Sequence, residues 1–263
     1  MKETYRNDVS YFCAFERGEN MKKKFWEMKQ SANKNEADIY IYGEIVAYKW
    51  DDGDTTAASF HNDLKALGDV EIINLHVNSP GGSVFEGIAI GNMLKAHKAT
   101  VNAYVDALAA SIASVITASC DVVYMYSNSM QMIHHPWMGC RGNAKDFRKT
   151  ADDLDAIAQA SIITYLNKSN GKLNEEQIVE VMDNESWISA IQAQEYGLCD
   201  IILGENQIAA ALSTDLFEKY QNVPEQFRQV IQNNQQVITE ERVQMAEQAK
   251  QSKQYINEIL GGI

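Results

Sequence analysis

The chain has 263 residues, of which 45% are hydrophobic, and it carries a formal net charge of -13 at pH 7. Its length suits one domain of about 200 residues plus an appendage. The negative charge excludes partners that bind basic faces, namely nucleic acids and anionic membrane surfaces. No apolar run reaches the ~18 residues of a membrane-spanning helix, so we expect no membrane partner.

Cysteine usage and the N-terminal composition bear on the cellular compartment. The four cysteines lie far apart and lack the paired spacing of zinc sites and disulfide frameworks. The first residues lack the apolar segment of an export signal. We therefore expect no metal, no cofactor and a reducing, cytoplasmic location.

Residues 1–36 are expected to form an N-terminal arm, because the first twenty are polar and show no periodicity. Codons for Arg17-Gly18-Glu19-Asn20 can resemble a bacterial ribosome-binding site, and Met21 follows immediately. Translation from Met21 is therefore one hypothesis. A genuine flexible arm that begins at Met1 is the other.

Residues 37–204 alternate between strand and helix patterns. Apolar residues recur at every second position in the strand segments and at every third or fourth position in the helix segments. The predicted strands lie near residues 39–42, 71–77, 101–105, 122–125 and 129–134, and the predicted helices near residues 55–67, 83–97 and 109–119. This alternation is typical of βαβ units, so we predict an α/β domain with a mostly parallel sheet.

A longer helix is predicted over residues 143–168, and Asn170-Gly171 ends it. At a rise of ~1.5 Å per residue it is about 40 Å long, more than a crossover between strands needs. The apolar face of this helix consists of Phe147, Leu154, Ile157, Ala158, Ser161, Ile162 and Tyr165. We expect it to project and to pack against another subunit. A surface helix within one domain is the alternative.

Residues 205–263 are predicted to form a polar C-terminal tail rich in Gln, Asn and Glu. Ile231, Ile238 and Met245 recur every seven residues, but Ser252 breaks the series. A short helix or weak coiled coil fits this pattern. A disordered polar tail fits it as well.

The loop Asn78-Ser79-Pro80-Gly81-Gly82 lies between a predicted strand and a predicted helix. Glycines here let the backbone approach a ligand and point N–H groups at it, and the helix adds its positive end. The loop is suited to an oxyanion, with the N–H of Gly82 as a donor. Turns of this kind also occur for steric reasons alone.

Ser111 lies in the small-residue segment Ala109-Ala110-Ser111-Ile112-Ala113-Ser114, at the start of a predicted helix. Its hydroxyl could attack a carbonyl whose oxygen is held by the N–H groups of Ile112 and Gly82. The alternative is a helix-capping serine, which is common at such positions.

His134 is the candidate base, because it ends a predicted strand and Pro136 fixes the chain soon after it. Catalytic groups of α/β proteins usually lie near such strand ends. A buried structural histidine is the alternative. His135 is a rival base, but alternation along the strand places it on the opposite face.

The acidic partner of the base is either Asp183 or Glu185. A carboxylate that hydrogen-bonds the imidazole fixes its tautomer and orientation. Without further context, a solvated acidic turn before a helix capped by Ser189 is the simpler interpretation.

Four motifs in a fixed order closely resemble the proteolytic subunit of Clp protease (ClpP). They are Asn78-Ser79-Pro80-Gly81-Gly82-Ser83, Ala109-Ala110-Ser111, Met132-Ile133-His134-His135-Pro136, and Trp187-Ile188-Ser189-Ala190 with Glu195-Tyr196-Gly197-Leu198-Cys199-Asp200. The resemblance covers roughly residues 37–203. It implies the ClpP/crotonase-like form of the α/β fold, built from repeated ββα and βαβ units.

The resemblance implies an ATP-independent core serine endopeptidase. Ser111 then becomes the nucleophile and His134 the general base, with the N–H groups of Gly82 and Ile112 as the oxyanion hole. The usual Gly or Met after the nucleophile is replaced by Ile112 and Ala113, which alters the adjoining substrate pocket but keeps the N–H.

The third member of the triad departs from the family pattern, which has Asp where this chain has Glu185. A glutamate is one methylene longer and can serve if the backbone lies slightly farther away. Asp183 is the alternative acid.

The resemblance also implies a homo-oligomer of seven-membered rings, stacked through the helix at residues 143–168 and the strand before it, here residues 139–142. Its enclosed chamber would admit unfolded or threaded polypeptides, and an unfoldase is a further candidate partner. The segment Ile39–Ile45 and the polar tail resemble the phage head-maturation (prohead) variety of the family. That variety implies capsid or scaffold proteins as substrates, in the host cytoplasm or inside the prohead.

Three alternatives remain at this point. A crotonase-type acyl-CoA enzyme shares the oxyanion hole formed by two amides but does not need Ser111 and His134. A ClpP-derived assembly or scaffold protein is the non-enzymatic alternative; the intact Ser111 and His134 argue against it, whereas the Glu185 departure leaves room for it. A Ser/Lys dyad is the weakest, because Lys145 is the lysine closest in sequence to the motifs.

Overall fold

The computed structural model describes residues 24–31, 35–47, 55–205 and 222. The strands in this part of the chain are β1 (Trp26–Gln30), β2 (Glu36–Tyr42), β3 (Ile72–Ser79), β4 (Thr100–Ala110), β5 (Val122–Tyr126), β6 (Met130–Ile133), β7 (Ser186–Ser189) and β8 (Ile201–Leu203). The helices are α1 (Ala57–Ala66), α2 (Val84–Lys95), α3 (Ile112–Ala118), α4 (Ala144–Ser169), α5 (Glu175–Asp183) and α6 (Ala190–Tyr196).

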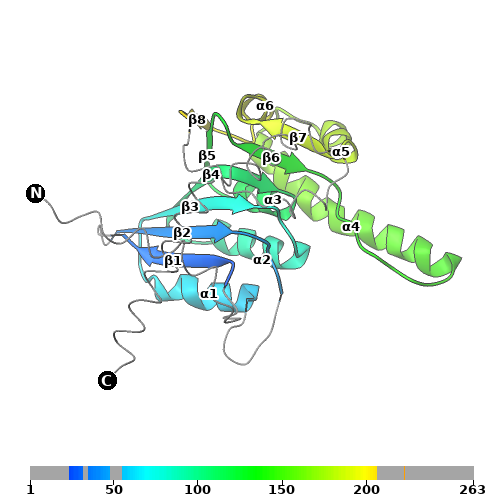
Figure 1. The fold of residues 1–263 in the computed structure, drawn as a ribbon, viewed down its shortest axis with the longest axis horizontal. Coiled ribbons are helices and arrows are strands. Elements are labelled where there is room, and N and C mark those ends of the chain that lie inside the picture. Colours follow the sequence, from blue (N-terminus) through cyan, green and yellow to red (C-terminus); the bar gives the residue numbers. More distant parts are fainter. Residues whose placement is uncertain (1–23, 32–34, 48–54, 206–221, 223–263) are drawn as a thin grey trace, which may run out of the picture.

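The strands form one sheet in the order β1-β2-β3-β4-β5-β8, and β6 pairs with both β4 and β7 (Figure 1). The pairs β2–β3, β3–β4, β4–β5, β4–β6 and β5–β8 are parallel. Only β1–β2 and β6–β7 are antiparallel among the described strand pairs. The predicted α/β class with a mostly parallel sheet is confirmed.

Three strands, β1, β7 and β8, were not expected from the sequence pattern, and β1 lies in the segment assigned to the N-terminal arm. Trp26 pairs with Ile41 of β2, and both side chains are buried. The Trp26 indole also donates to Asp63 of α1 over 2.8 Å. The sheet therefore begins before residue 37. Met21 and most of the predicted tail lie outside the described residues.

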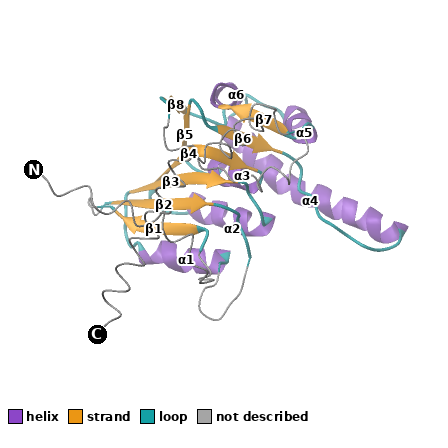
Figure 2. Ribbon diagram, in the orientation of Figure 1, coloured by secondary structure: helices purple, strands orange, loops and turns teal. Residues whose placement is uncertain are grey.

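Helices α1, α2 and α3 cover one face of the sheet (Figure 2). Alternate residues of β2 and β3 point into this layer and are fully buried: Ala37, Ile39, Ile41, Ile73, Leu75 and Val77. Each large apolar side chain buried in this way contributes about 1.5–3 kcal/mol. A slip by one residue would expose the whole set, so the register of these strands is fixed.

The boundary between β4 and α3 differs from the prediction of a helix over residues 109–119. Strand β4 continues to Ala110 and the helix begins at Ile112. The reason is that Ala109 pairs on both sides, with Ser79 of β3 and with Gln131 of β6. These ladders override the helix propensity of alanine, and Ser111 becomes the single residue of a sharp strand-to-helix turn.

Helix α4 matches the predicted long helix closely. Its Asn143 side chain accepts hydrogen bonds from the N–H groups of Lys145 and Asp146, and the helix ends at Asn170 in the left-handed conformation. Its C-terminal half packs on the domain through residues such as Ile162 and Tyr165, whereas its N-terminal half projects away from it (Figure 1). The apolar face therefore serves the domain's own core over only part of its length.

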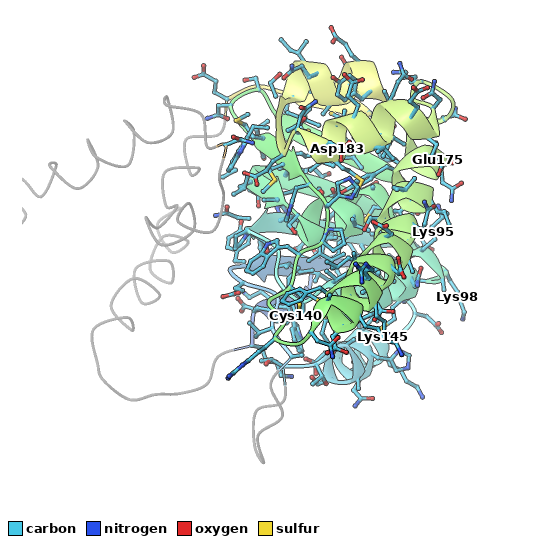
Figure 3. All side chains as sticks on the ribbon, turned by 90° about the vertical axis from the view of Figure 1, so that its right-hand side faces the viewer. Lys95, Lys98, Cys140, Lys145, Glu175 and Asp183 are labelled. Atoms are coloured by element: carbon cyan, nitrogen blue, oxygen red, sulfur yellow. The ribbon has the colours of Figure 1, made fainter. Side chains whose placement is uncertain are left out.

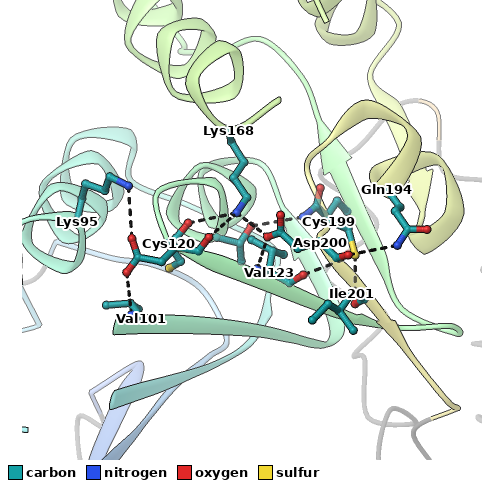
Figure 4. Close-up of polar contacts among 12 residues, drawn as sticks. Lys95, Val101, Cys120, Val123, Lys168, Gln194, Cys199, Asp200 and Ile201 are labelled. Atoms are coloured by element: carbon teal, nitrogen blue, oxygen red, sulfur yellow. Dashed lines mark hydrogen bonds and ion pairs between the residues drawn. The ribbon is translucent and has the colours of Figure 1, made fainter. Parts of the chain in front are cut away.

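The end of α4 is tied to the sheet by Lys168, whose side chain is 8% exposed. Its ammonium donates to the backbone oxygens of Cys120 and Asp121 over 3.3 and 3.1 Å (Figure 4). It also lies 2.7 Å from the carboxylate of Asp200, which accepts from the Val123 N–H. One cation thus joins α4, the end of α3 and the strands β5 and β8.

Residues 139–142 do not form the strand that the resemblance implied. They belong to an exposed connection between β6 and α4, and Cys140 lies beside the turn that carries Lys145 (Figure 3). A strand needs a neighbour for its backbone hydrogen bonds, and the described part of this chain supplies none there. None of the described helices is long and apolar enough to cross a membrane.

Candidate active site

The loop after β3 is held in shape by Ser79, which is completely buried. Its hydroxyl donates to the Gly43 oxygen over 2.6 Å and accepts from the Gly81 N–H over 3.1 Å. Gly82 has a φ of 142°, and a Cβ built there would lie 2.1 Å from the Ile45 oxygen. Only glycine therefore fits at residue 82.

Two hydrogen bonds hold Gly82 beside Ile45 while leaving its own amide for a ligand. The Ile45 N–H donates to the Gly81 oxygen, and the Ser83 N–H donates to the Ile45 oxygen, each over 2.7 Å. Within the described residues the Gly82 N–H has no protein acceptor. The loop thus presents a fixed N–H donor.

Ser111 occupies the turn between β4 and α3 with φ 54° and ψ -129°. Its hydroxyl does not cap the helix, so the interpretation as a capping serine is wrong. Its N–H donates to the Met132 oxygen of β6 over 2.8 Å, and its carbonyl accepts from the Ser114 N–H over 2.9 Å. A non-glycine residue in such a conformation is strained and is held in place by its surroundings.

The hydroxyl of Ser111 lies 2.8 Å from Nε2 of His134. The parallel pairing of β4 with β6 explains this contact, because Ala110 lies opposite Met132 and the two chains continue to Ser111 and His134. Burial lowers the pKa of His134, the Glu185 carboxylate raises it in part, and His135 lowers it further. The imidazole is therefore neutral at pH 7 and can accept the hydroxyl proton.

The rival base and the alternative acid are paired with each other. Nε2 of His135 lies 3.0 Å from a carboxylate oxygen of Asp183. This contact is an ion pair when the imidazole is protonated, although its angles are not those of a hydrogen bond. The structure brings neither of the two to Ser111.

Glu185 follows α5 and precedes β7 with a φ of 47°. In the antiparallel pairing of β6 with β7, Ile133 lies opposite Ser186. One further step of the same register places Glu185 opposite His134, which explains the electrostatic effect of the carboxylate on the imidazole. Oε1 of Glu185 also accepts from the backbone N–H of Asn222, a residue of the predicted tail, over 2.9 Å.

A cleft of about 340 Å³ opens over these groups. Residues 80–84, Ser111 and His134 line it, together with Glu44, Pro136 and Trp137. Among the described residues, no cluster of three or more His, Cys, Asp or Glu side chains is placed to hold a metal ion. The cleft thus combines a hydroxyl, a neutral base and an N–H donor, which is the equipment for nucleophilic attack on a carbonyl.

Sequence reasoning missed two groups behind the nucleophile. Ser114 donates its hydroxyl proton to the Ser111 carbonyl over 2.6 Å, and the phenol oxygen of Tyr165 lies 2.7 Å from the Ser114 hydroxyl. Tyr165 belongs to the apolar face of α4, where its position was attributed to packing alone. Nothing in the local pattern indicates that its hydroxyl meets α3.

The chain is similar to known proteins of one family. The family model described as Clp protease matches residues 27–206. An ATP-dependent Clp protease proteolytic subunit 1 from Salinibacter ruber is 32% identical over 152 residues, which cover 57% of this chain and 64% of that protein. A subunit of the same name from Prochlorococcus marinus is 33% identical over 138 residues, which cover 52% of this chain and 70% of that protein. The proteolytic subunit from Pleurastrum terricola is 31% identical over 144 residues, covering 54% and 72% of the two chains.

Proposed function

The chain belongs to the Clp protease family of serine-type endopeptidases, and on that premise we propose that it hydrolyses peptide bonds with Ser111, His134 and Glu185 as its triad. The contact of 2.8 Å between the Ser111 hydroxyl and His134 Nε2, two residues that line the cleft, carries this proposal. A merely structural serine or histidine has no reason to meet its partner there.

In the acylation step, Oγ of Ser111 attacks the carbonyl carbon of the substrate and its proton moves to Nε2 of His134. The carbonyl oxygen becomes an oxyanion that the N–H groups of Gly82 and Ile112 stabilise. Neither amide has a protein acceptor within the described residues. The carbon–nitrogen bond then breaks, and His134 donates its proton to the leaving amine.

In the deacylation step, a water molecule attacks the acyl ester on Ser111 and gives a proton to His134. The bond between the acyl carbon and Oγ breaks, and His134 returns the proton to Ser111. The products are a carboxylic acid and the free enzyme, so no cofactor enters the balance.

We assign the third triad position to Glu185 and not to Asp183. The last pair of β6 and β7 joins Ile133 to Ser186, and continuing that register by one residue brings Glu185 opposite His134, which supports this choice. Asp183 lies against His135 instead. Glu185 stands just before β7 with a φ of 47°, and the extra methylene of glutamate adds reach toward His134. A carboxylate there stabilises the imidazolium that forms during attack.

We further propose that the protein works as a homo-oligomeric ring and that it processes phage capsid or scaffold proteins. The projecting N-terminal half of α4, with Phe147 half exposed, supports the assembly. The phage assignment rests on the resemblance of residues 39–45 and of the polar tail. Co-expression with a candidate capsid protein, followed by mass spectrometry of that protein, tests it. A capsid protein that remains intact beside an active peptidase would exclude that substrate.

Labelling with a fluorophosphonate probe, followed by peptide mapping, tests the triad. We expect the probe on Ser111 of the wild type, none on Ser111→Ala, and sharply reduced labelling of Glu185→Ala. Asp183→Ala and Ser119→Ala serve as controls and should label like the wild type. Undiminished peptide hydrolysis by Ser111→Ala would refute the assignment. An unlabelled wild-type protein would favour the scaffold alternative.

A further inference from the structure

We propose that Tyr165 and Ser114 are positioning residues that hold the Ser111–Ile112 peptide group in the orientation needed for oxyanion stabilisation. The inference deepens the proposed function and rests on it, because the Ile112 N–H of this peptide is one of the two proposed donors. Tyr165 comes from α4, and Ser114 lies on the first turn of α3.

The hydroxyls of Tyr165 and Ser114 form a directed chain that ends on Ser111. Their oxygens are 2.7 Å apart, and the Ser114 hydroxyl lies 2.6 Å from the Ser111 carbonyl oxygen. The Met132 oxygen lies farther from this hydroxyl, at 3.5 Å, so the single proton of Ser114 goes to the nearer Ser111 oxygen. The phenol of Tyr165 must then be the donor to Ser114.

Both hydroxyls are withdrawn from solvent, with Ser114 at 1% and Tyr165 at 2% exposure. Burial raises the pKa of Tyr165 well above its ordinary value, so the phenol keeps its proton at neutral pH. A buried hydroxyl chain keeps one arrangement when each donor has one short acceptor, as the Tyr165 phenol has in Ser114 and the Ser114 hydroxyl has in the Ser111 oxygen. The chain therefore transmits a fixed position from α4 to the turn at Ser111.

The target of the chain is the carbonyl end of the peptide whose other end is the proposed donor. In a planar trans peptide the C=O and the N–H point in opposite directions. Fixing the Ser111 oxygen therefore fixes the direction of the Ile112 N–H. A hydrogen bond to the oxygen also polarises the peptide and strengthens its N–H as a donor.

The strained backbone of Ser111 explains why the peptide needs such a hold. A φ of 54° is unfavourable for serine, so surrounding contacts are needed to hold the backbone of Ser111 in this conformation. The Ser114 N–H and hydroxyl both donate to the Ser111 oxygen, so this peptide is held by two bonds from one residue. Tyr165 fixes the hydroxyl that makes the shorter of the two.

Steady-state kinetics of Tyr165→Phe, Ser114→Ala and the double variant test the proposal on a fluorogenic peptide that the wild type cleaves. Removal of a whole oxyanion donor costs about 10²–10³ in kcat, so a misaimed donor should cost about tenfold. We expect kcat to fall about tenfold with KM within about twofold, because the donor acts on the transition state. Affinity for a peptide boronic acid, whose tetrahedral adduct occupies the same site, should fall in parallel with kcat/KM.

Thr117→Val is the matched control, because Thr117 is also a buried hydroxyl of α3 but donates to the Ser114 oxygen, away from the Ser111 peptide. It should lose thermal stability without losing kcat or boronate affinity. The proposal is overturned if Tyr165→Phe and Ser114→Ala behave like Thr117→Val, or if KM rises while kcat holds. A wild type that neither cleaves peptides nor takes the fluorophosphonate on Ser111 would instead refute the proposed function itself, and this inference with it.

Discussion

The charge of His134 is set by opposing neighbours. Burial lowers its pKa, and the Glu185 carboxylate raises it in part. The neutral form is the one that accepts a proton, so the acidic limb of kcat/KM reports this pKa in the free enzyme. Removing the carboxylate removes an influence that raises the pKa, and the limb must then move to lower pH.

Glu185→Gln should therefore show an acidic limb at lower pH, together with a kcat reduced by about 10²-fold or more, because an amide can hold the wrong tautomer of the imidazole. The measurement is the pH profile of kcat/KM for a chromogenic peptide. Asp183→Asn is the control and should leave the limb nearly in place. A shift with Asp183→Asn and none with Glu185→Gln would transfer the role to Asp183.

Individual site residues were predictable to different degrees, for physical reasons. Local sequence patterns indicate a strand end or a turn at Ser111, His134 and Gly82, so these residues were predictable. The choice between Asp183 and Glu185 depends on how β7 pairs with β6, and no local pattern contains that register. The contact between Ser114 and Tyr165 joins residues 51 positions apart, so only the packing of α4 reveals it.

At the level of elements, prediction succeeded where a long periodic segment has clear ends. The bounds of α4 follow from its cap at Asn143 and its stop at Asn170. Prediction failed where strand pairing decides the outcome. Ala109, for example, was expected in a helix but lies in β4, where it pairs with residues of β3 and β6. Strands β1 and β7 are short and acquire their conformation only from a neighbouring strand, so their own residues indicate little.

The tie between α4 and the sheet makes Lys168 the element-scale test of stability. Lys168→Met keeps the length and apolar stem of the side chain but leaves the oxygens of Cys120 and Asp121 without this donor. We expect a loss of about 1–3 kcal/mol in the free energy of unfolding, because these two backbone oxygens lose a hydrogen-bond donor. Urea denaturation followed by circular dichroism measures it.

Lys98→Met is the matched control for this change. Lys98 pairs with Asp69, but the two side chains are 88% and 95% exposed. Exposed ion pairs contribute little, so the unfolding curve of this variant should nearly match that of the wild type. Equal effects of the two substitutions would mean that the buried contacts of Lys168 do not stabilise the joint.

At the scale of the whole molecule, the projecting half of α4 tests the proposed assembly. Phe147 is 51% exposed on a segment that has little contact with its own domain (Figure 1). Phe147→Glu places a charge on this apolar position and should shift the oligomer to smaller species in native mass spectrometry. Lys145→Gln, on the same projecting turn, should keep the oligomer. An unchanged oligomer in Phe147→Glu would exclude this half of α4 as a contact.

The contact of Asn222 with Glu185 links one described residue of the predicted tail to the proposed catalytic acid. The backbone N–H of Asn222 donates to Oε1 of Glu185 over 2.9 Å, whereas the side-chain amide of Asn222 donates to the Asn184 oxygen. Asn222→Pro removes both the N–H and the side chain, whereas Asn222→Ala removes only the side chain, so the comparison of the two variants tests the backbone hydrogen bond.

Without the N–H donor, the negative charge of the Glu185 carboxylate is less neutralised and attracts the protonated imidazole of His134 more strongly. The pKa of His134 should then rise, and the acidic limb of kcat/KM should move to higher pH, opposite to Glu185→Gln. A profile of Asn222→Pro that matches that of Asn222→Ala would show that this bond does not tune the proposed base, His134.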